Sequence, residues 1–200
     1  EFSNFFGTKY SVSANSATTA LHSAIASLGV EPGDEVIVPP YTMSASATCV
    51  LFSGGVPIFC DIDDEIFCLE PKMVEQCITP RTKGIVAVNL FGHPAKLHQL
   101  RKIADKHKIF LLEDNSQAPG AKIENAFAGT IGDVGVFSFN RHKTMQSGEG
   151  GVAICNDDRL ALRMQLVRNH GEVIVSSFNL FDSKDISNTV GLNYRMTEME

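Results

Sequence analysis

The sequence lacks the features that would place it in several specialised classes of protein. No apolar stretch approaches the roughly 20 residues of a membrane span, and no internal repeat, low-complexity tract or block of like charge occurs. With 17 Lys and Arg against 23 Asp and Glu, the formal net charge is -6. Because nucleic-acid binding needs clustered cations that neutralise phosphates, this composition argues against a nucleic-acid partner, and the apolar pattern argues against a membrane partner.

Cysteine is sparse, and no two cysteines have a C-x-x-C spacing. The number of cysteines is odd, and the five are Cys49, Cys60, Cys68, Cys77 and Cys155. This pattern excludes a disulfide-dense mini-protein, so we interpret the five as reduced thiols that are mostly buried as small hydrophobic residues. The chain also opens without a charged and then apolar leader, and we therefore expect a cytoplasmic protein.

Short apolar runs alternate with amphipathic segments along the chain. The runs are rich in Val, Ile and Phe and apolar on both faces, as strands are when helices cover both sides of a sheet. They lie at 35–38, 56–60, 84–90, 109–112, 134–139 and 151–155. Helical patterns lie between them, at 17–28, 96–106 and 159–168. The alternation predicts an α/β domain with a mainly parallel sheet.

Three polar clusters follow predicted strands, at 13–19, 113–117 and 138–143. In open α/β sheets, ligands bind beyond the carboxyl ends of the strands, so we expect the clusters to converge on one site. The first cluster opens a helix with small residues, whose free backbone N–H groups suit an anion, and Ser16 and Thr18 add hydroxyl donors. Taken alone, this segment is more often an ordinary helix cap.

Asp114 and Lys143 carry the chemistry that the other two clusters offer. Asp114 follows four apolar residues, where a carboxylate needs a cation or hydrogen-bond donor, although a solvated strand end is the alternative. Lys143, alone a surface lysine, precedes a glycine-rich stretch at 146–151 that either approaches a ligand or turns the chain into the next strand. A helix start that can bind a phosphate (residues 16–18, here called the phosphate cradle), a buried carboxylate and a lysine together indicate pyridoxal phosphate. The aldehyde of this cofactor forms a Schiff base with an amine.

Four segments carry a resemblance that covers essentially the whole chain. They are Ser-Ala-Thr-Thr-Ala-Leu at 16–21, Glu-Asp-Asn-Ser-Gln-Ala-Pro-Gly-Ala at 113–121, Gly-Asp-Val-Gly-Val-Phe-Ser-Phe at 132–139 with Lys143 and Gly-Glu-Gly-Gly at 148–151, and Gly-Leu-Asn-Tyr-Arg-Met at 191–196. By these motifs the sequence resembles the DegT/DnrJ/StrS family of sugar aminotransferases, which are fold-type I pyridoxal phosphate enzymes. The resemblance implies a three-layer α/β/α sandwich with a mainly parallel sheet.

The resemblance also implies roles for single residues. Lys143 would be the internal aldimine lysine and proton shuttle, Asp114 would pair with the pyridine nitrogen, and Gln117 would lie near the hydroxyl face of the ring. A further set would hold the phosphate: Ser16, the backbone of Ala17 and Thr18, the Ser138 hydroxyl, and Asn193 reaching from a neighbouring subunit of a homodimer. We expect no metal ion.

The family reaction transfers an amino group from glutamate or glutamine to a keto-sugar, usually nucleotide-linked, in the biosynthesis of surface polysaccharides or secondary-metabolite sugars. Residues 1–200 would then form the cofactor-binding large domain, incomplete at its N-terminus. A small C-terminal domain would begin beyond Glu200. If instead the chain were complete, it would be a non-catalytic binding or regulatory remnant.

The sequence departs from the family pattern at several positions. Ala17 replaces a usual glycine, and Met43 stands where an aromatic ring generally stacks on the cofactor, a place that Tyr41 could also fill. Asn89 stands where histidine is common. A subset of the family replaces the lysine with histidine and acts as a sugar dehydratase. Because three residues separate Phe139 from Lys143, the lysine and not the adjacent histidine occupies this position, which favours transamination.

Two other groups of residues have unremarkable interpretations. The acidic residues at 61, 63 and 64 form a solvated strand end and turn rather than a divalent-metal site. The histidines at 22, 93, 98 and 107 have no metal-ligand spacing, and the His-Gly pair at 170–171 is typical of a helix end.

Overall fold

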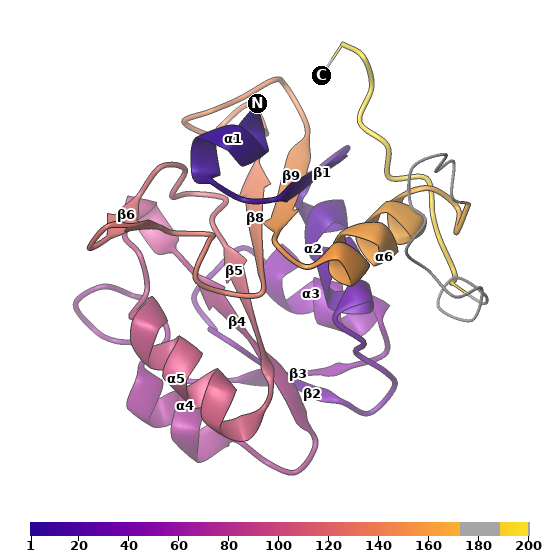
Figure 1. The fold of residues 1–200 in the computed structure, drawn as a ribbon. Coiled ribbons are helices and arrows are strands. Elements are labelled where there is room, and N and C mark those ends of the chain that lie inside the picture. Colours follow the sequence, from indigo (N-terminus) through magenta and orange to yellow (C-terminus); the bar gives the residue numbers. More distant parts are fainter. Residues whose placement is uncertain (173–188, 200) are drawn as a thin grey trace.

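A seven-stranded sheet forms the middle layer of the protein in the computed structural model, which describes residues 1–172 and 189–199 (Figure 1). Its order is β1-β9-β8-β5-β4-β2-β3. These strands are β1 (Tyr10–Ala14), β2 (Glu35–Val38), β3 (Val56–Phe59), β4 (Thr82–Val88), β5 (Phe110–Asp114), β8 (Val134–Ser138) and β9 (Gly151–Cys155). All neighbours from β8 to β3 pair in parallel, while β9 pairs antiparallel with β1 and β8. The predicted, mainly parallel α/β sheet is confirmed.

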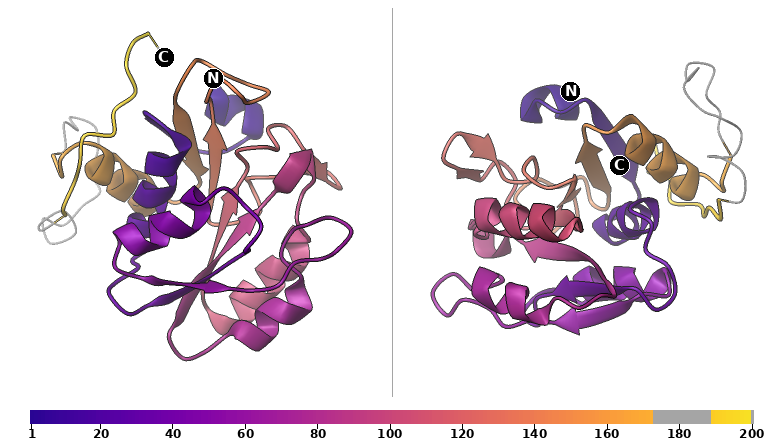
Figure 2. Two further views of the ribbon diagram at one scale, coloured as in Figure 1. Left: turned by 180° about the vertical axis from the view of Figure 1, so that it is seen from behind. Right: turned by 60° about the horizontal axis from the view of Figure 1, so that its bottom comes forward.

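Helices cover both faces of this sheet and complete three layers (Figure 2). One face carries α2 (Ala17–Ser27), α3 (Ala45–Phe52) and α6 (Asp158–Arg168). The other carries α4 (Pro71–Cys77) and α5 (Leu97–His107). The remaining elements are short: α1 (Phe2–Phe6), the 3₁₀ turn η1 (Leu90–Gly92), and the hairpin of β6 (Lys122–Ile123) and β7 (Ala126–Phe127).

Two apolar clusters fill the space between the layers. The larger one joins buried side chains of β2, β4 and β5 to those of α2 and α5. The smaller one is aromatic and packs α1 and β7 onto β8, since the ring of Phe6 lies 4.7 Å from that of Phe137 and 5.2 Å from that of Phe127. Edge and tilted ring pairs at these distances add to the free energy of burial.

The edge strand β3 differs from its prediction. Its apolar composition predicted burial on both faces, but Val56 is 45% and Phe59 is 60% exposed. The reason is its place at the end of the strand order, where no further strand pairs with it among the described residues, although α3 contacts it. Apolar composition reports how hydrophobic a strand is and not whether it lies in the middle of a sheet.

Burial makes the cysteines unequal in reactivity, which gives a first test of the packing. Cys49, Cys60, Cys68 and Cys155 are buried, whereas Cys77 is partly exposed at the end of α4. Desolvation raises the pKa of Cys60 to about 12 and that of Cys155 to about 11. Iodoacetamide at pH 8 is therefore expected to label Cys77 first in the native protein, and peptide mass mapping checks this. Equally fast native labelling of a buried cysteine would contradict the packing.

None of the helices within residues 1–172 and 189–199 combines the length and apolar character that crossing a membrane requires. Over the same ranges, no three His, Cys, Asp or Glu side chains are grouped so that they could hold a metal ion. In the acidic turn after β3, the Asp63 carboxylate instead accepts hydrogen bonds from the Glu65 and Ile66 N–H groups. It also forms an ion pair with Lys96 at 2.7 Å.

Candidate active site

A cavity of about 390 Å³ opens at the carboxyl ends of β1, β5 and β8. All three polar clusters that were expected to converge contribute to its wall. The predicted site residues that line it are Ser16, Ala17, Thr18, Met43, Asp114, Gln117, Ser138 and Lys143. The amine of one loop and the carboxylate of another strand therefore share one hollow.

The start of α2 forms one wall of the cavity. Ser16 has extended backbone and caps the helix, since its Oγ accepts the Thr19 N–H at 3.2 Å. The first intrahelical bond runs from the Ala20 N–H to the Ser16 carbonyl, so the N–H groups of Ala17 and Thr18 have no intrahelical acceptor. The first turn carries no acidic residue. The segment is thus both a capped helix start and a potential anion cradle, and the two interpretations are compatible.

The sequence left two roles open for the glycines after Lys143, a tight turn or a close approach to a ligand, and the structure assigns different roles to different glycines. Gly148 and Gly150 have φ of +98° and +132°, which a turn requires and other residues rarely adopt. Gly151 instead permits a close approach, because a Cβ there would lie 2.5 Å from the Ala17 nitrogen. The atoms close to Gly151 belong to the backbone of the phosphate cradle and not to a ligand, so the first residue of β9 packs directly against the start of α2.

Substituting Gly151 with alanine is expected to displace this cradle. The clash is with backbone, so we expect a loss of stability of about 1–3 kcal/mol together with weaker binding of a phosphate-bearing ligand. Gly29→Ala is the matched control, because Gly29 has φ of +78° and open space around it. It should lose stability through backbone strain but keep phosphate affinity. Thermal unfolding and equilibrium titration with pyridoxal phosphate measure both, and unchanged affinity in Gly151→Ala would contradict the role of β9.

Asp114 ends β5 at the edge of the cavity and is 4% exposed. Its Oδ2 accepts a hydrogen bond from the Ser46 hydroxyl at 2.8 Å, and its Oδ1 accepts one from the Ser116 N–H at 3.1 Å. Both donors are neutral, and a buried carboxylate is stabilised further by a cationic partner. Asp114 is therefore suited to a positively charged group of a ligand in the cavity. Ser46, on α3, was missed in the sequence because nothing distinguishes it within a Ser- and Thr-rich segment.

Glu113 corrects the expectation that the whole 113–117 cluster faces the site. Successive strand residues point to opposite faces, and Glu113 lies on the face away from Asp114. It is fully buried and accepts backbone N–H groups from Gly129 at 2.6 Å, Ile131 at 2.8 Å and Gly132 at 2.6 Å. Burial raises the pKa of Glu113, and these donors oppose that shift. Glu113 therefore holds the 129–132 loop rather than a ligand.

Asn89, the departure at a position where the family commonly has histidine, also lies outside the cavity wall. It is fully buried, its Oδ1 accepts the Ala95 N–H at 2.7 Å, and its Nδ2 donates to Asn115. Asn89 therefore holds the neighbouring chain at Ala95 and Asn115 and does not line the cavity.

Lys143 is held by a loop that is cross-braced between β8 and β9. Its own N–H donates to the Asn140 carbonyl at 2.8 Å, and the Asn140 side chain donates to Glu149 at 2.7 Å. The Arg141 N–H donates to the Gly148 carbonyl at 2.9 Å. These bonds fix the backbone on both sides of the lysine. His142 lines the cavity as well; the sequence placed it in the 138–143 cluster but gave it no role of its own.

Met43 and Tyr41 were alternative candidates for covering a cofactor ring. Met43 lines the cavity and is 69% exposed, so its thioether is available to a ligand face. Tyr41 is absent from the cavity wall and contacts the rings of Phe67 and Phe91 at 6.0 and 6.1 Å. The structure therefore brings Met43, and not Tyr41, to the candidate site.

Asn193 is exposed and does not line the cavity. It belongs to a segment whose next residue, Tyr194, accepts the Asn15 N–H at 2.8 Å and donates its own N–H to the Arg168 carbonyl at 2.9 Å. Its predicted contact with the phosphate of a neighbouring subunit stays a prediction.

Comparison with known proteins agrees with this geometry. The model of the DegT/DnrJ/EryC1/StrS aminotransferase family matches residues 1–200. The chain belongs to this family. The chain is 38% identical over 199 residues to the GDP-perosamine synthase of Caulobacter vibrioides, covering 100% of this chain and 52% of the relative. It is 45% identical over 170 residues to the L-glutamine:2-deoxy-scyllo-inosose aminotransferase of Streptomyces kanamyceticus, covering 85% and 40%.

Solved structures show the same fold as this DegT/DnrJ/EryC1/StrS chain. The aminotransferase from Psychrobacter cryohalolentis superposes with a TM-score of 0.92 at 35% identity, over 99% of this chain and 51% of that one. NtdA from Bacillus subtilis, solved with bound PMP, has a TM-score of 0.85 at 33% identity, over 98% and 43%. The family and fold type are thus confirmed, and the second neighbour supports pyridoxal phosphate as the cofactor. The chain spans about half the length of GDP-perosamine synthase.

Proposed function

We propose that this chain forms the pyridoxal phosphate-binding part of an enzyme that transfers an amino group from glutamate or glutamine to a nucleotide-linked keto-sugar. The observation that carries the proposal is the shared cavity, in which Lys143, Asp114 and the start of α2 meet. Membership of the aminotransferase family supports the reaction class. The names of the two relatives, a GDP-perosamine synthase and a glutamine-dependent cyclitol aminotransferase, support an acceptor of the sugar type and this class of donor.

The residues present fit the chemical groups of this cofactor. The free N–H groups at Ala17 and Thr18 and the Ser138 hydroxyl suit its phosphate, and the Asp114 carboxylate suits a protonated ring nitrogen. The Lys143 amine is a nucleophile for its aldehyde. When bound, the cofactor supplies an electron-accepting ring that stabilises negative charge at the carbon from which a proton is removed.

Each side chain then has a defined task. Asp114 would hold the ring nitrogen in its protonated form, because a buried carboxylate strongly favours a positive neighbour. Lys143 would hold the aldehyde carbon of the cofactor, and as a free amine it would move a proton at the carbon of the amino donor. Gln117, whose Oε1 accepts the Phe91 N–H at 3.0 Å, keeps its amide N–H groups for the hydroxyl side of the ring. Met43 would cover one ring face.

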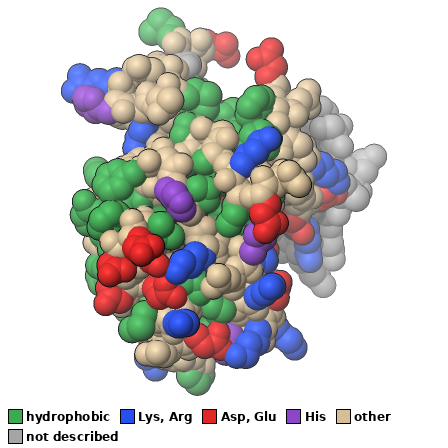
Figure 3. Space-filling model, turned by 90° about the vertical axis from the view of Figure 1, so that its left-hand side faces the viewer, with side chains coloured by type: hydrophobic (Ala, Val, Ile, Leu, Met, Phe, Trp, Pro, Cys, Tyr) green, Lys and Arg blue, Asp and Glu red, His purple; other side chains and the backbone are tan. Residues whose placement is uncertain are grey.

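A second copy of the chain is the partner that best fits the surface beside the cavity. Tyr41, Phe67 and Phe91 follow three neighbouring strands, are 51%, 42% and 65% exposed, and touch one another with ring centroids within 6.3 Å. Hydrophobic side chains also gather on part of the face drawn in Figure 3. Exposed aromatic clusters of this kind are typical of protein interfaces. We propose a homodimer in which Asn193 reaches the partner's phosphate site.

The cytoplasm is the compartment that fits these chemical requirements. All five cysteines are free thiols, which agrees with a reducing environment. Glutamate and nucleotide-linked sugars would be the small-molecule substrates there.

Transfer of labelled nitrogen tests the function directly. The protein that contains this chain is incubated with ¹⁵N-labelled glutamate or glutamine, pyridoxal phosphate and a nucleotide-linked keto-sugar. We expect ¹⁵N in the sugar product by mass spectrometry. Loss of water from the sugar without incorporation of nitrogen would indicate the dehydratase instead. Binding without turnover of any sugar tested would indicate the non-catalytic remnant.

A further inference from the structure

Residues 189–196, here called the C-terminal strap, are fastened to the elements that carry the phosphate cradle. The Leu192 N–H donates to the Val167 carbonyl at 2.8 Å, and the Tyr194 N–H donates to the Arg168 carbonyl at 2.9 Å. In the opposite direction, the Asn15 N–H donates to the Tyr194 carbonyl at 2.8 Å. The strap therefore joins the end of α6 to the residue just before the cap of α2.

The side chain of Tyr194 adds an anchor on α2 itself. Its hydroxyl lies 3.0 Å from His22 Nδ1, and the two rings meet edge to face with centroids 5.8 Å apart. His22 is 9% exposed and also meets the Phe52 ring at 5.5 Å. Burial lowers the pKa of His22 and raises that of Tyr194, so both groups are neutral near neutral pH. The anchor is a hydrogen bond between neutral groups and contains no ion pair.

A series of hydrogen bonds links the backbone of Tyr194 to the cradle. Asn15, held by the strap through its N–H, accepts the Thr19 hydroxyl on its Oδ1 at 2.7 Å. Thr19 in turn donates its N–H to the Ser16 Oγ at 3.2 Å. The Thr19 hydroxyl also lies 2.9 Å from the Ser16 carbonyl oxygen and 3.1 Å from the Ser16 Oγ, so Thr19 contacts the cap with its side chain as well. The geometry of the Ser16 cap, and with it the direction of the first N–H groups of α2, thus depends on where Tyr194 holds the strap.

We propose that Tyr194, anchored by His22, is a positioning residue that sets the phosphate cradle at the start of α2. The proposal rests on the proposed function, because it takes the ligand of the cradle to be the phosphate of pyridoxal phosphate. Tyr194 does not line the cavity, so it acts through Asn15 and Thr19. Its effect should therefore fall on the affinity for the phosphate group and leave the contacts to the ring unchanged.

Comparison of two ligands tests this selectivity. The cofactor-free protein carrying Tyr194→Phe is titrated with pyridoxal phosphate and with pyridoxal, which lacks only the phosphate. Loss of one partly buried hydrogen bond predicts an affinity for pyridoxal phosphate that is about three- to tenfold weaker, with the affinity for pyridoxal unchanged. Equal weakening for both ligands would show a merely structural role. Unchanged affinity for pyridoxal phosphate would overturn the proposal as well.

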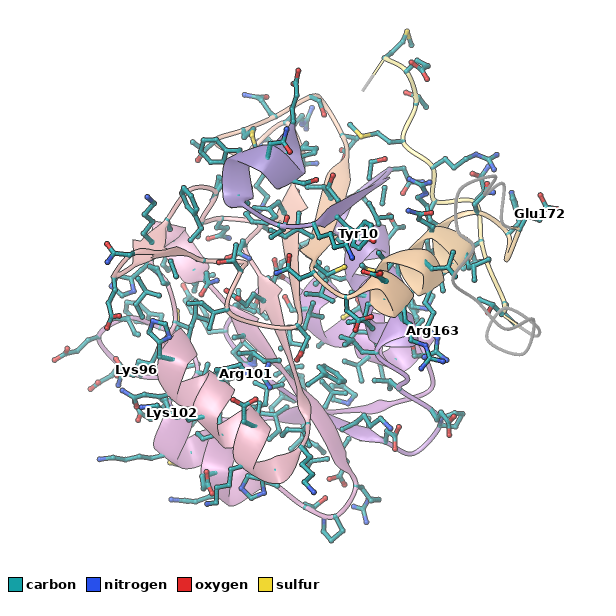
Figure 4. The ribbon with its side chains drawn as sticks, viewed as in Figure 1. Tyr10, Lys96, Arg101, Lys102, Arg163 and Glu172 are labelled. Carbon is teal, nitrogen blue, oxygen red and sulfur yellow. The ribbon has the colours of Figure 1, made fainter. Side chains whose placement is uncertain are left out.

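Two further variants keep the test independent of folding defects. Thr19→Val removes the hydroxyl in the middle of the series with little change of shape, and it should give the same selective loss. The double variant should lose no more than the larger single loss, because both substitutions break one series of bonds. Tyr10→Phe is the control, since it removes a hydroxyl from β1 at the end of that strand remote from the cradle (Figure 4). It should leave both affinities unchanged.

The same titrations separate failure of this inference from failure of the proposed function. Wild-type protein that binds pyridoxal phosphate no more tightly than pyridoxal has no phosphate cradle, and this result overturns both proposals. Wild-type protein that prefers pyridoxal phosphate, with a Tyr194→Phe variant that keeps the full preference, overturns only the role of Tyr194.

Discussion

Replacing Lys143 with alanine is expected to abolish the covalent bond between protein and cofactor and to lower the rate of amino transfer by about 10²- to 10⁴-fold, the usual contribution of a general acid–base group. The lysine lies on the wall of the cavity in a cross-braced loop, so its removal deletes the amine without disturbing β8 or β9. Single-turnover measurement of pyridoxal phosphate consumption with glutamate gives the rate. The absorbance band near the visible edge reports the covalent bond.

Lys102→Ala is the matched control for this substitution. Lys102 projects from α5, on the layer opposite α2 and away from the cavity wall (Figure 4). The Lys102→Ala substitution removes the same charge and the same side chain from an exposed position, so both the rate of amino transfer and the absorbance band should be unchanged. A Lys143→Ala variant that kept the band would show that another amine binds the cofactor.

Asp114→Asn is expected to give the second large effect, a decrease in the rate of about 150- to 5,000-fold. The substitution keeps the shape of the side chain but removes the charge that would face the ring nitrogen. Loss of one partner of a buried ion pair costs about 3–5 kcal/mol, which corresponds to this range of rates. The covalent bond to Lys143 should still form, because the amine and aldehyde are untouched. Rapid-mixing absorbance separates these two steps.

The neighbouring carboxylate gives a contrast that an unspecific loss of charge would not produce. Both oxygens of Glu113 accept hydrogen bonds from backbone N–H groups. In Glu113→Gln, the side-chain NH₂ group must therefore face at least one of these N–H donors, and that hydrogen bond is lost. We expect this variant to lose about 1–3 kcal/mol of stability, whereas Asp114→Asn should lose catalysis with a smaller change in unfolding temperature. A stable Glu113→Gln protein together with an unfolded Asp114→Asn protein would contradict the assigned faces of β5.

The strands of the middle of the sheet could be predicted from the sequence because burial on both faces leaves a continuous apolar run. β9 lies at the predicted residues, and β5 extends two residues beyond its apolar run, to Asp114. The short helices α1, α3 and α4 could not be predicted in the same way. α3, for example, has apolar residues around its whole circumference and so has no helical period that distinguishes it from a strand or loop.

The candidate site was predictable where the residue type itself implies chemistry and topology gathers the strand ends. What the sequence could not supply was the direction of each side chain. Glu113 and Asp114 are adjacent acids whose side chains point to opposite faces of the sheet. The sequence does not show which of the two faces the cavity. The pair of His22 and Tyr194 is separated by 172 positions, and nothing local to either residue indicates the other. Such contacts arise from tertiary packing alone.

The most direct test of the shared site is the identity of the amine that binds the cofactor. The protein is loaded with pyridoxal phosphate, reduced with borohydride, digested and mapped by mass spectrometry. The geometry predicts a single phosphopyridoxyl adduct on the peptide that contains Lys143, absent from the Lys143→Ala variant. An adduct on any other lysine, or no adduct on a protein that binds the cofactor, would contradict the assignment of this cavity as the active site.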